Sequence, residues 1–337
     1  MRSRKYIALR TSHFALLVML YKLLKIPARL AFWIYCRNLR VNDRSLFKSK
    51  GPLMLAVNHP NSFLDAVILA TLFKKPIYSL ARGDAFANNF YTRLLTSLNI
   101  FPVYRVSEGV ENLEHNYTTF GRCEELFKRN GIVLIFSEGR CINEWHLRPL
   151  KKGTARLATS AWQQNIPLKV LPIGINYQSF HSFGKNIQLN FGTPITENVI
   201  DDTNGFGKNV QDFNSALRSE LEDLVEEIDS RDTVALKSKF EVDQSMIKKL
   251  LLFFPSVAGY LVHAPLYLPI KSLAWKKAKL NDHYDSAIMG LLFITYPFYL
   301  LIISMILFFV TKSWYSFSAI PALPVFAWSY VQLKKQF

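Results

Sequence analysis

The chain has 337 residues, of which 50% are hydrophobic and 14% aromatic. This length is large for one compact domain and small for three, and the composition allows a sizeable core with apolar surface left over. Lys and Arg outnumber Asp and Glu by 41 to 25, which gives a formal net charge of +16. Such a charge favours an anionic partner, and because basic residues flank long apolar stretches, anionic membrane lipid fits better than nucleic acid.

Cysteine usage argues against a disulfide framework and against a bound metal. The three cysteines, Cys36, Cys123 and Cys141, are odd in number, and their spacings match no metal motif. We therefore expect free thiols on the reducing side of a membrane, with no metal and no redox cofactor.

The first region, residues 1–50, is basic and mostly helical in pattern. An apolar run at 14–21 follows several arginines and imitates a signal peptide, but Lys22 and Lys25 occupy the place where small residues should mark a cleavage site. The pattern favours a basic amphipathic helix that lies in the membrane interface. An uncleaved signal anchor is the alternative.

The second region, residues 51–245, reads as an α/β domain in which short β-rich runs alternate with helical patterns. This alternation, with near-continuous apolar strands, predicts a mainly parallel sheet flanked by helices. The predicted strands are 52–58, 76–80, 132–136, 169–175 and 187–191. The predicted helices are 63–73, 87–98, 111–129, 152–164 and 212–228.

The third region, residues 246–337, carries the membrane signal. Residues 286–311 contain no charge and exceed the roughly 20 residues needed to span a bilayer. Residues 313–332 are also uncharged, so the two segments predict a transmembrane helical hairpin. The apolar stretch 250–270 is interrupted by prolines, and lysines follow it. Because lysines prefer the cytoplasmic side, we expect 250–270 to be re-entrant or interfacial, with the α/β domain on the cytoplasmic face.

The strongest local signal is NHPNSFLD at residues 58–65, where a predicted strand gives way to a helix. Active groups gather at the carboxyl ends of strands in open α/β sheets. One interpretation is a dyad in which Asp65 orients His59, leaving the other imidazole nitrogen to take a proton from a hydroxyl. The other is structural: Ser62 and Asp65 form a capping box, and His59 is an ordinary loop histidine.

Three further blocks follow in the chain. Arg105 ends the run FPVYR, and the planar guanidinium suits phosphate, although most arginines are surface residues. At another strand end, Glu138 and Arg140 flank Gly139, which lets backbone approach a ligand closely; a plain turn with a salt bridge is the alternative. Finally, the apolar run 170–177 contains Pro172, which suits a pocket wall or an edge strand.

In this order, the four blocks resemble the glycerolipid acyltransferase family, which includes lysophosphatidate and glycerol-3-phosphate acyltransferases. The family pattern is Asn-His-x4-Asp, Phe-x-x-Arg, Phe-Pro-Glu-Gly and an apolar strand with proline, and the resemblance covers roughly residues 50–195. This chain departs from it: five residues separate His59 from Asp65, Ser137 replaces the proline, and Arg140 replaces threonine or glycine. The longer spacing is similar to that of fungal-type glycerol-3-phosphate/dihydroxyacetone-phosphate acyltransferases.

The resemblance implies that His59 is the general base and Asp65 its orienting partner, that Arg105 binds an acceptor phosphate, and that Glu138, Gly139 and Arg140 help to bind the acceptor. The donor would be acyl-CoA or acyl-carrier protein, and the acceptor glycerol 3-phosphate or dihydroxyacetone phosphate. We expect direct attack by the acceptor rather than an acyl-enzyme.

Two alternatives stay open. One is acylation of lysophosphatidate or another lysolipid by the same fold. The other is a non-catalytic membrane-binding or nucleic-acid-binding protein that uses the positive charge, although this leaves the paired polar residues at the strand ends without an explanation.

Overall fold

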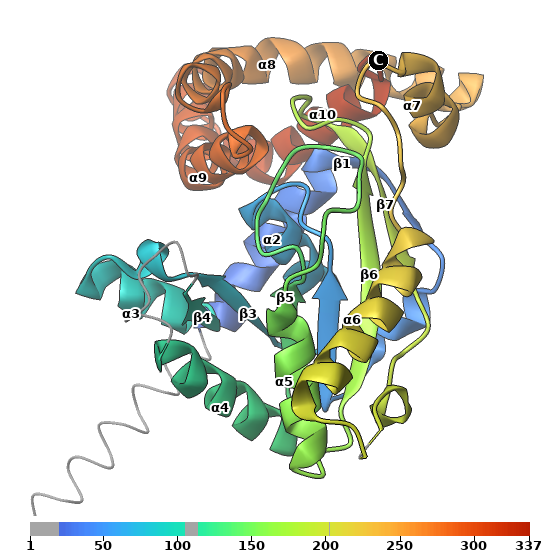
Figure 1. Cartoon of the computed structure of the whole chain (residues 1–337). Coiled ribbons are helices and arrows are strands. Elements are labelled where there is room, and N and C mark those ends of the chain that lie inside the picture. Colours follow the sequence, from blue (N-terminus) through green and yellow to red (C-terminus); the bar gives the residue numbers. More distant parts are fainter. Residues whose placement is uncertain (1–19, 105–113, 202) are drawn as a thin grey trace, which may run out of the picture.

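A computed structural model describes residues 20–104, 114–201 and 203–337, so the candidate phosphate ligand Arg105 lies outside the described residues. A seven-stranded sheet in the order β1-β7-β6-β2-β5-β3-β4 forms the centre (Figure 1). Only β6 and β7 pair antiparallel, and the other neighbours pair parallel, which confirms the predicted mainly parallel sheet. The strands are β1 (Cys36–Val41), β2 (Leu53–Val57), β3 (Ile77–Arg82), β4 (Ile100–Val103), β5 (Ile132–Phe136), β6 (Lys169–Tyr177) and β7 (Lys185–Phe191).

Helices cover both faces of the sheet. Because successive strand residues point to opposite faces, Met54 and Ala56 of β2 pack on one side and Leu55 and Val57 on the other. The first face is covered by α4 (Glu114–Lys128), α5 (Lys152–Gln163) and α6 (Phe206–Glu222). The second is covered by α2 (Phe63–Leu72) and by the helical residues 20–35. The remaining helices of this part are α3 (Asn89–Ser97) and α7 (Thr233–Phe240).

The sheet begins earlier in the chain than the sequence indicated. Residues 36–41, which we assigned to a mostly helical basic region, form β1 and pair with β7 at the edge of the sheet. The helix before it is tied to the second face by two cations: Lys25 Nζ donates to the carbonyl of Phe73 at 2.5 Å, and Arg29 Nε to that of Thr71 at 2.8 Å. Both carbonyls lie at the end of α2, where cations are favourable.

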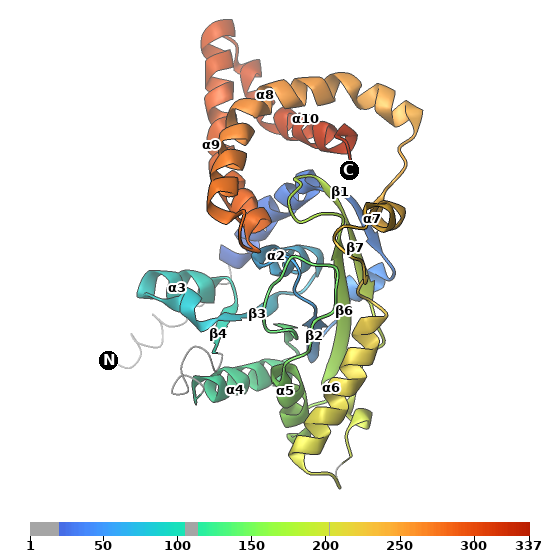
Figure 2. The same cartoon turned by 45° about the horizontal axis from the view of Figure 1, so that its top comes forward.

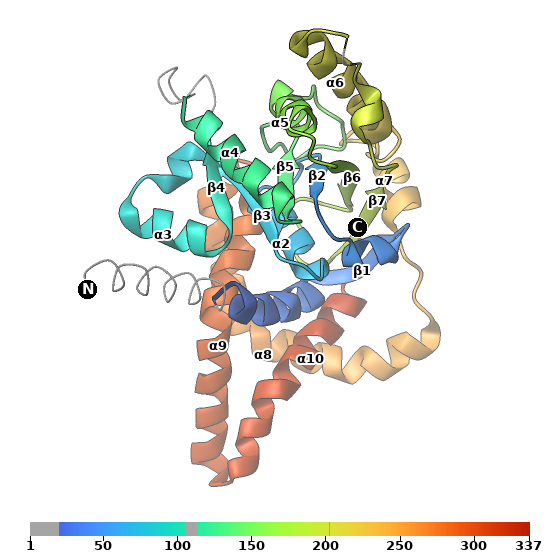
Figure 3. The same cartoon turned by 90° about the horizontal axis from the view of Figure 1, so that it is seen from below.

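The C-terminal region consists of α8 (Met246–Ala278), α9 (Tyr284–Thr311) and α10 (Ala319–Leu333). A residue in the left-handed conformation, Lys312 with φ 54°, ends α9, and a 3₁₀ turn at Trp314–Ser318 leads into α10. The two helices meet at this turn, which projects away from the α/β domain, and they diverge toward that domain (Figure 3). With 15 residues, α10 is shorter than a spanning helix requires, so the transmembrane hairpin over 286–311 and 313–332 stays a prediction. Large apolar side chains on the hairpin are exposed, among them Ile302, Phe309 and Val310, which suits contact with lipid.

The helix α8 is continuous through Pro255, Pro265 and Pro269 and bends on its way to α9 (Figure 2). It crosses α10 so closely that a Cβ on Gly259 would lie 2.1 Å from the carbonyl oxygen of Phe326. Such small-residue crossings are typical of membrane helices. Among the described residues, α8 and α9 are the two helices that are long and apolar enough to cross a membrane. The interfacial or re-entrant placement of residues 250–270 stays a prediction.

Candidate active site

The candidate site lies at the carboxyl ends of β2, β5 and β6, which are parallel neighbours and therefore end at the same edge of the sheet. Asn58, directly after β2, joins this turn to β6. Its Nδ2 donates to the carbonyl of Ile175 at 3.1 Å, and its Oδ1 accepts from the N–H of Ile175 at 2.8 Å. The turn that carries His59 is thus fixed to the sheet at its first residue.

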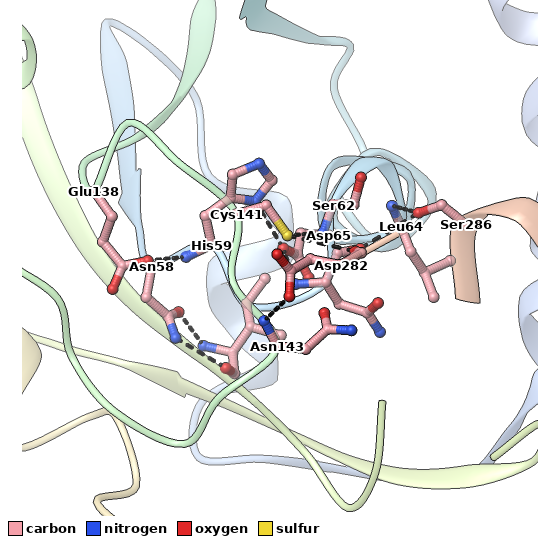
Figure 4. A network of polar contacts seen from close by, with 12 residues as sticks. Asn58, His59, Ser62, Leu64, Asp65, Glu138, Cys141, Asn143, Asp282 and Ser286 are labelled. Atoms are coloured by element: carbon pink, nitrogen blue, oxygen red, sulfur yellow. Dashed lines mark hydrogen bonds and ion pairs between the residues drawn. The ribbon is translucent and has the colours of Figure 1, made fainter. Parts of the chain in front are cut away.

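His59 and Asp65 come together as the sequence motif suggests. The imidazole Nδ1 lies 2.9 Å from Oδ2 of Asp65, which is fully buried in the first turn of α2 (Figure 4). Asp65 Oδ2 also accepts from the N–H of Asn61 at 2.9 Å, and Oδ1 accepts from the hydroxyl of Tyr177 at 2.7 Å. Because a carboxylate accepts hydrogen bonds, it holds the proton of the neutral imidazole on Nδ1, which leaves a lone pair on Nε2.

The imidazole is also fixed as a plane. The ring of His59 stacks on Phe136, the last residue of β5, with centroids 3.8 Å apart and an interplanar angle of 11°. The His59 side chain keeps 18% of its surface exposed, so Nε2 can be reached from outside. A buried carboxylate, a defined tautomer and an accessible nitrogen are what a general base requires.

Glu138 is buried and makes backbone contacts with both carboxylate oxygens. Oε2 accepts from the N–H of His59 at 2.6 Å, and Oε1 accepts from the N–H of Arg148 at 2.8 Å. Burial raises the pKa of Glu138, and these two N–H donors oppose that rise. The observed contacts tie two loops together at the dyad, while a role for Glu138 in binding the acceptor stays a prediction.

The neighbours of Glu138 also adopt a defined conformation. Gly139 has φ 65°, a conformation that side-chain-bearing residues rarely adopt, and a Cβ there would lie 2.9 Å from Cγ of Lys151. Arg140 is exposed. Tyr104 follows β4, a parallel edge strand two places from β5 in the sheet. Its N–H donates to Oδ1 of Asn116 and its carbonyl accepts from Nδ2 of Asn116, each at 2.8 Å, just before Arg105. Acceptor binding by Gly139, Arg140 and Arg105 stays a prediction.

Ser62 does not form the capping box that the structural interpretation of this motif requires. It precedes α2 as an N-cap should, but its hydroxyl makes no capping bond and instead lies 2.7 Å from Nδ1 of His283. Its φ of 53° is strained for a residue with a side chain. Its N–H donates to Sγ of Cys141 at 2.8 Å. Tertiary partners therefore hold this residue, where sequence reasoning assigned a local cap.

Cys141 lies beside the dyad without the properties of a nucleophile. Burial and the nearby charge of Asp65 raise the pKa of the Cys141 thiol, so it stays protonated at neutral pH. Its Sγ accepts the N–H of Ser62 and donates to the carbonyl of Asp282 at 3.7 Å. These contacts suit a structural thiol.

A buried group of polar side chains beside the dyad was not predicted from the sequence. Lys185, the first residue of β7, forms a fully buried ion pair with Asp285 in the first turn of α9. Asn61 Nδ2 donates to Asp285 Oδ2 at 2.9 Å, and the hydroxyl of Tyr35 donates to the same oxygen at 3.2 Å. One signal was available, because Asp285 directly precedes the uncharged residues 286–311.

Comparison with known proteins bears on the same part of the chain. Residues 38–176 match the model of the family described as Acyltransferase, and this range contains His59, Asp65 and Glu138. No curated protein sequence matches the chain. Eight chains among solved structures do. One is the crystal structure of PlsC, the 1-acyl-sn-glycerophosphate (LPA) acyltransferase from Thermotoga maritima, with 14% identity and a TM-score of 0.44, covering 68% of this chain and 85% of that one.

Proposed function

We propose that this chain is a membrane-bound O-acyltransferase that moves a fatty acyl chain from acyl-CoA or acyl-carrier protein to the sn-1 position of a glycerol phosphate, either glycerol 3-phosphate or dihydroxyacetone phosphate. The observation that carries the proposal is the 2.9 Å contact between His59 Nδ1 and the buried Asp65 Oδ2, within a segment that matches the acyltransferase family model.

The chemistry follows from the orientation of the imidazole. His59 Nε2 takes the proton of the acceptor hydroxyl while that oxygen attacks the thioester carbonyl carbon. The tetrahedral intermediate then collapses, the C–S bond breaks and the ester forms. The leaving thiolate takes the proton back from the imidazolium, so the enzyme returns to its starting state. Asp65 stabilises the imidazolium between the two steps, as a buried carboxylate partner does.

A phosphorylated acceptor is favoured by the charge of the chain and by the residues predicted to bind it. The net charge of +16 attracts anionic substrates to the surface. Arg105 and Arg140 are the proposed phosphate ligands, because a guanidinium offers phosphate two parallel hydrogen bonds.

The membrane region supports the use of an insoluble acyl chain. The tip of the α9–α10 hairpin carries Lys312, Trp314 and Tyr315, and the two aromatic residues are highly exposed, as in the aromatic belts of membrane proteins. Lys276 and Lys277 lie in the last turn of α8, shortly before the turn of α9 that contacts Asn61, and Lys334, which follows α10, donates to the carbonyl of Phe183 just before β7. This charge distribution favours the α/β domain on the cytoplasmic face.

A thiol-release assay on the purified full chain tests the proposal. The acceptors are glycerol 3-phosphate, dihydroxyacetone phosphate and lysophosphatidate, each with acyl-CoA or acyl-carrier protein as donor. We expect thiol release and a matching ester product with glycerol 3-phosphate or dihydroxyacetone phosphate. Transfer to lysophosphatidate alone would replace the proposed acceptor by its alternative. Absence of transfer to every acceptor would refute the enzymatic function.

A further inference from the structure

The N-terminal end of α9 lies directly against the turn that carries the dyad, although it belongs to the membrane region. Asp282 Oδ1 accepts from the N–H of Asn143 at 2.9 Å (Figure 4). Ser286 Oγ accepts from the N–H of Leu64 at 3.3 Å. Together with His283 and Asp285, these residues form a segment at 282–286, which lies outside the range 38–176 that matches the family model. A part of the chain beyond the matched domain therefore borders the proposed catalytic residues.

The centre of this contact is the ion pair of Asp285 with Lys185. Both side chains are fully buried, and the Lys185 Nζ also lies 5.5 Å from the ring centroid of Tyr35 and 5.8 Å from that of Tyr177. Burial lowers the pKa of Lys185, and the charge of Asp285 opposes that change. A buried ion pair is a weak contributor to stability, because the loss of hydration offsets much of the attraction.

Asn61 joins this ion pair to the dyad. Its side-chain Nδ2 donates to Asp285 Oδ2 at 2.9 Å, and its backbone N–H donates to Asp65 Oδ2, also at 2.9 Å. The same oxygen of Asp65 is the hydrogen-bond partner of His59 Nδ1. One fully buried residue thus connects α9 to the carboxylate that orients the imidazole.

The network is not explained by packing alone. Within the described part of the chain, the buried Oδ1 of Asn61 and Oδ1 of Asp285 have no hydrogen-bond partner. Unsatisfied buried oxygens cost free energy, and apolar residues of similar volume would fill the same space without that cost. What the polar group does provide is a directional contact, because the hydrogen bond from Asn61 Nδ2 to Asp285 Oδ2 fixes the orientation of Asn61.

We propose that Asp285, paired with Lys185, is a positioning residue for catalysis: the first turn of α9 holds Asn61, and through it Asp65 and His59, in the working geometry. Catalysis then requires α9 to be docked on the α/β domain, which couples activity to the correct placement of a membrane helix. This inference rests on the proposed acyltransferase function.

A double variant tests the inference in the full chain. Lys185→Met/Asp285→Leu removes both charges together and so avoids the unpaired buried charge that either single variant would leave. We expect a melting temperature close to that of the wild type and a kcat lower by about 10²-fold, the scale of an ångström-sized misplacement of a catalytic group. The KM values for donor and acceptor should change little. The control is Lys208→Gln/Asp212→Asn, which removes an exposed ion pair on α6 and should leave kcat unchanged.

Two results of this assay would overturn the inference. One is a kcat equal to that of the wild type. The other is a loss of kcat that only parallels a loss of folded protein, because a merely structural ion pair would produce that.

A second measurement does not depend on activity. Cys141 Sγ lies between the N–H of Ser62 and the carbonyl of Asp282, so its labelling by N-ethylmaleimide, read by mass spectrometry, reports whether α9 is docked. We expect clearly faster labelling in the double variant than in the wild type. If the wild type transfers no acyl chain to any acceptor, the proposed function fails, and this labelling alone decides whether the ion pair holds the turn. Unchanged labelling would then overturn the inference.

Discussion

The backbone N–H of His59 donates a 2.6 Å hydrogen bond to Oε2 of Glu138, which joins the turn after β2 to the turn after β5. The side chain of the same histidine is held by a different carboxylate, Asp65. Glu138 therefore fixes the backbone that carries the imidazole, and Asp65 fixes the imidazole itself. The two acids can be separated experimentally, because they act on different parts of one residue.

The first prediction concerns Glu138→Gln. Glutamine keeps one acceptor oxygen and places an NH₂ group against the other N–H donor, so a buried donor loses its partner. We expect unfolding to become about 1–3 kcal/mol more favourable and kcat to fall by about 10²-fold as His59 shifts. Urea unfolding and steady-state kinetics measure the two effects. The control Glu125→Gln, which changes an exposed acid on α4, should alter neither quantity. Wild-type kcat in Glu138→Gln would show that this carboxylate does not position His59.

The second prediction concerns Asp65→Asn. The amide no longer carries the negative charge that stabilises the imidazolium, and its NH₂ group can donate to Nδ1 and move the imidazole proton to Nε2. We expect kcat to fall by about 10²–10⁴-fold, the scale for loss of general base catalysis. Steady-state thiol release with the preferred acceptor measures this change. Asp212→Asn, at a half-exposed position of α6 outside the candidate site, serves as the matched control. An Asp65→Asn variant that keeps most of its activity would show that the His59–Asp65 contact is structural only.

Cys141→Ser provides a third prediction. Because its raised pKa keeps the thiol protonated at neutral pH, Cys141 is a poor nucleophile, and serine can still accept the hydrogen bond from the N–H of Ser62. We expect the variant to keep most of its kcat and the wild type to carry no acyl group on Cys141. Kinetics and intact-protein mass spectrometry check both statements. Accumulation of an acyl-cysteine in the wild type would replace direct attack by a two-step mechanism.

Arg105→Ala tests the proposed phosphate ligand. Loss of a charge-assisted hydrogen bond of about 1.5–3 kcal/mol should raise the KM for a phosphorylated acceptor by about 10–100-fold, with a smaller effect on kcat. An acceptor without phosphate should be acylated equally well by the variant and the wild type. If both acceptors suffer to the same degree, Arg105 does not bind the phosphate.

Much of the fold could be predicted because its signals are local. The central strands β2 and β5 are short apolar runs, and helices such as α5 show apolar residues at helical spacing. The edge strand β1 escaped prediction, because its sequence CRNLRV contains two arginines and follows a helix with no turn signal between them. Its strand conformation depends on pairing with β7, which is distant in the sequence.

The site was predictable only where its residues follow strands. His59 and Glu138 lie two residues beyond the ends of β2 and β5, and parallel strands bring such residues to one edge. Lys185 and Asp285 are 100 positions apart, and no periodicity relates them. The capping role assigned to Ser62 considered only nearby backbone, whereas its hydroxyl is taken by His283 from the membrane region. Contacts between the two regions were therefore beyond the reach of local sequence patterns.

The most direct test of the account is the turnover of His59→Ala beside the wild type, measured as ester product formed from acyl-CoA and glycerol 3-phosphate. The account predicts a fall in kcat of about 10²–10⁴-fold, with the melting temperature and the KM for the donor essentially unchanged. Near-normal turnover in His59→Ala would contradict it, because no general base would then be needed at that position.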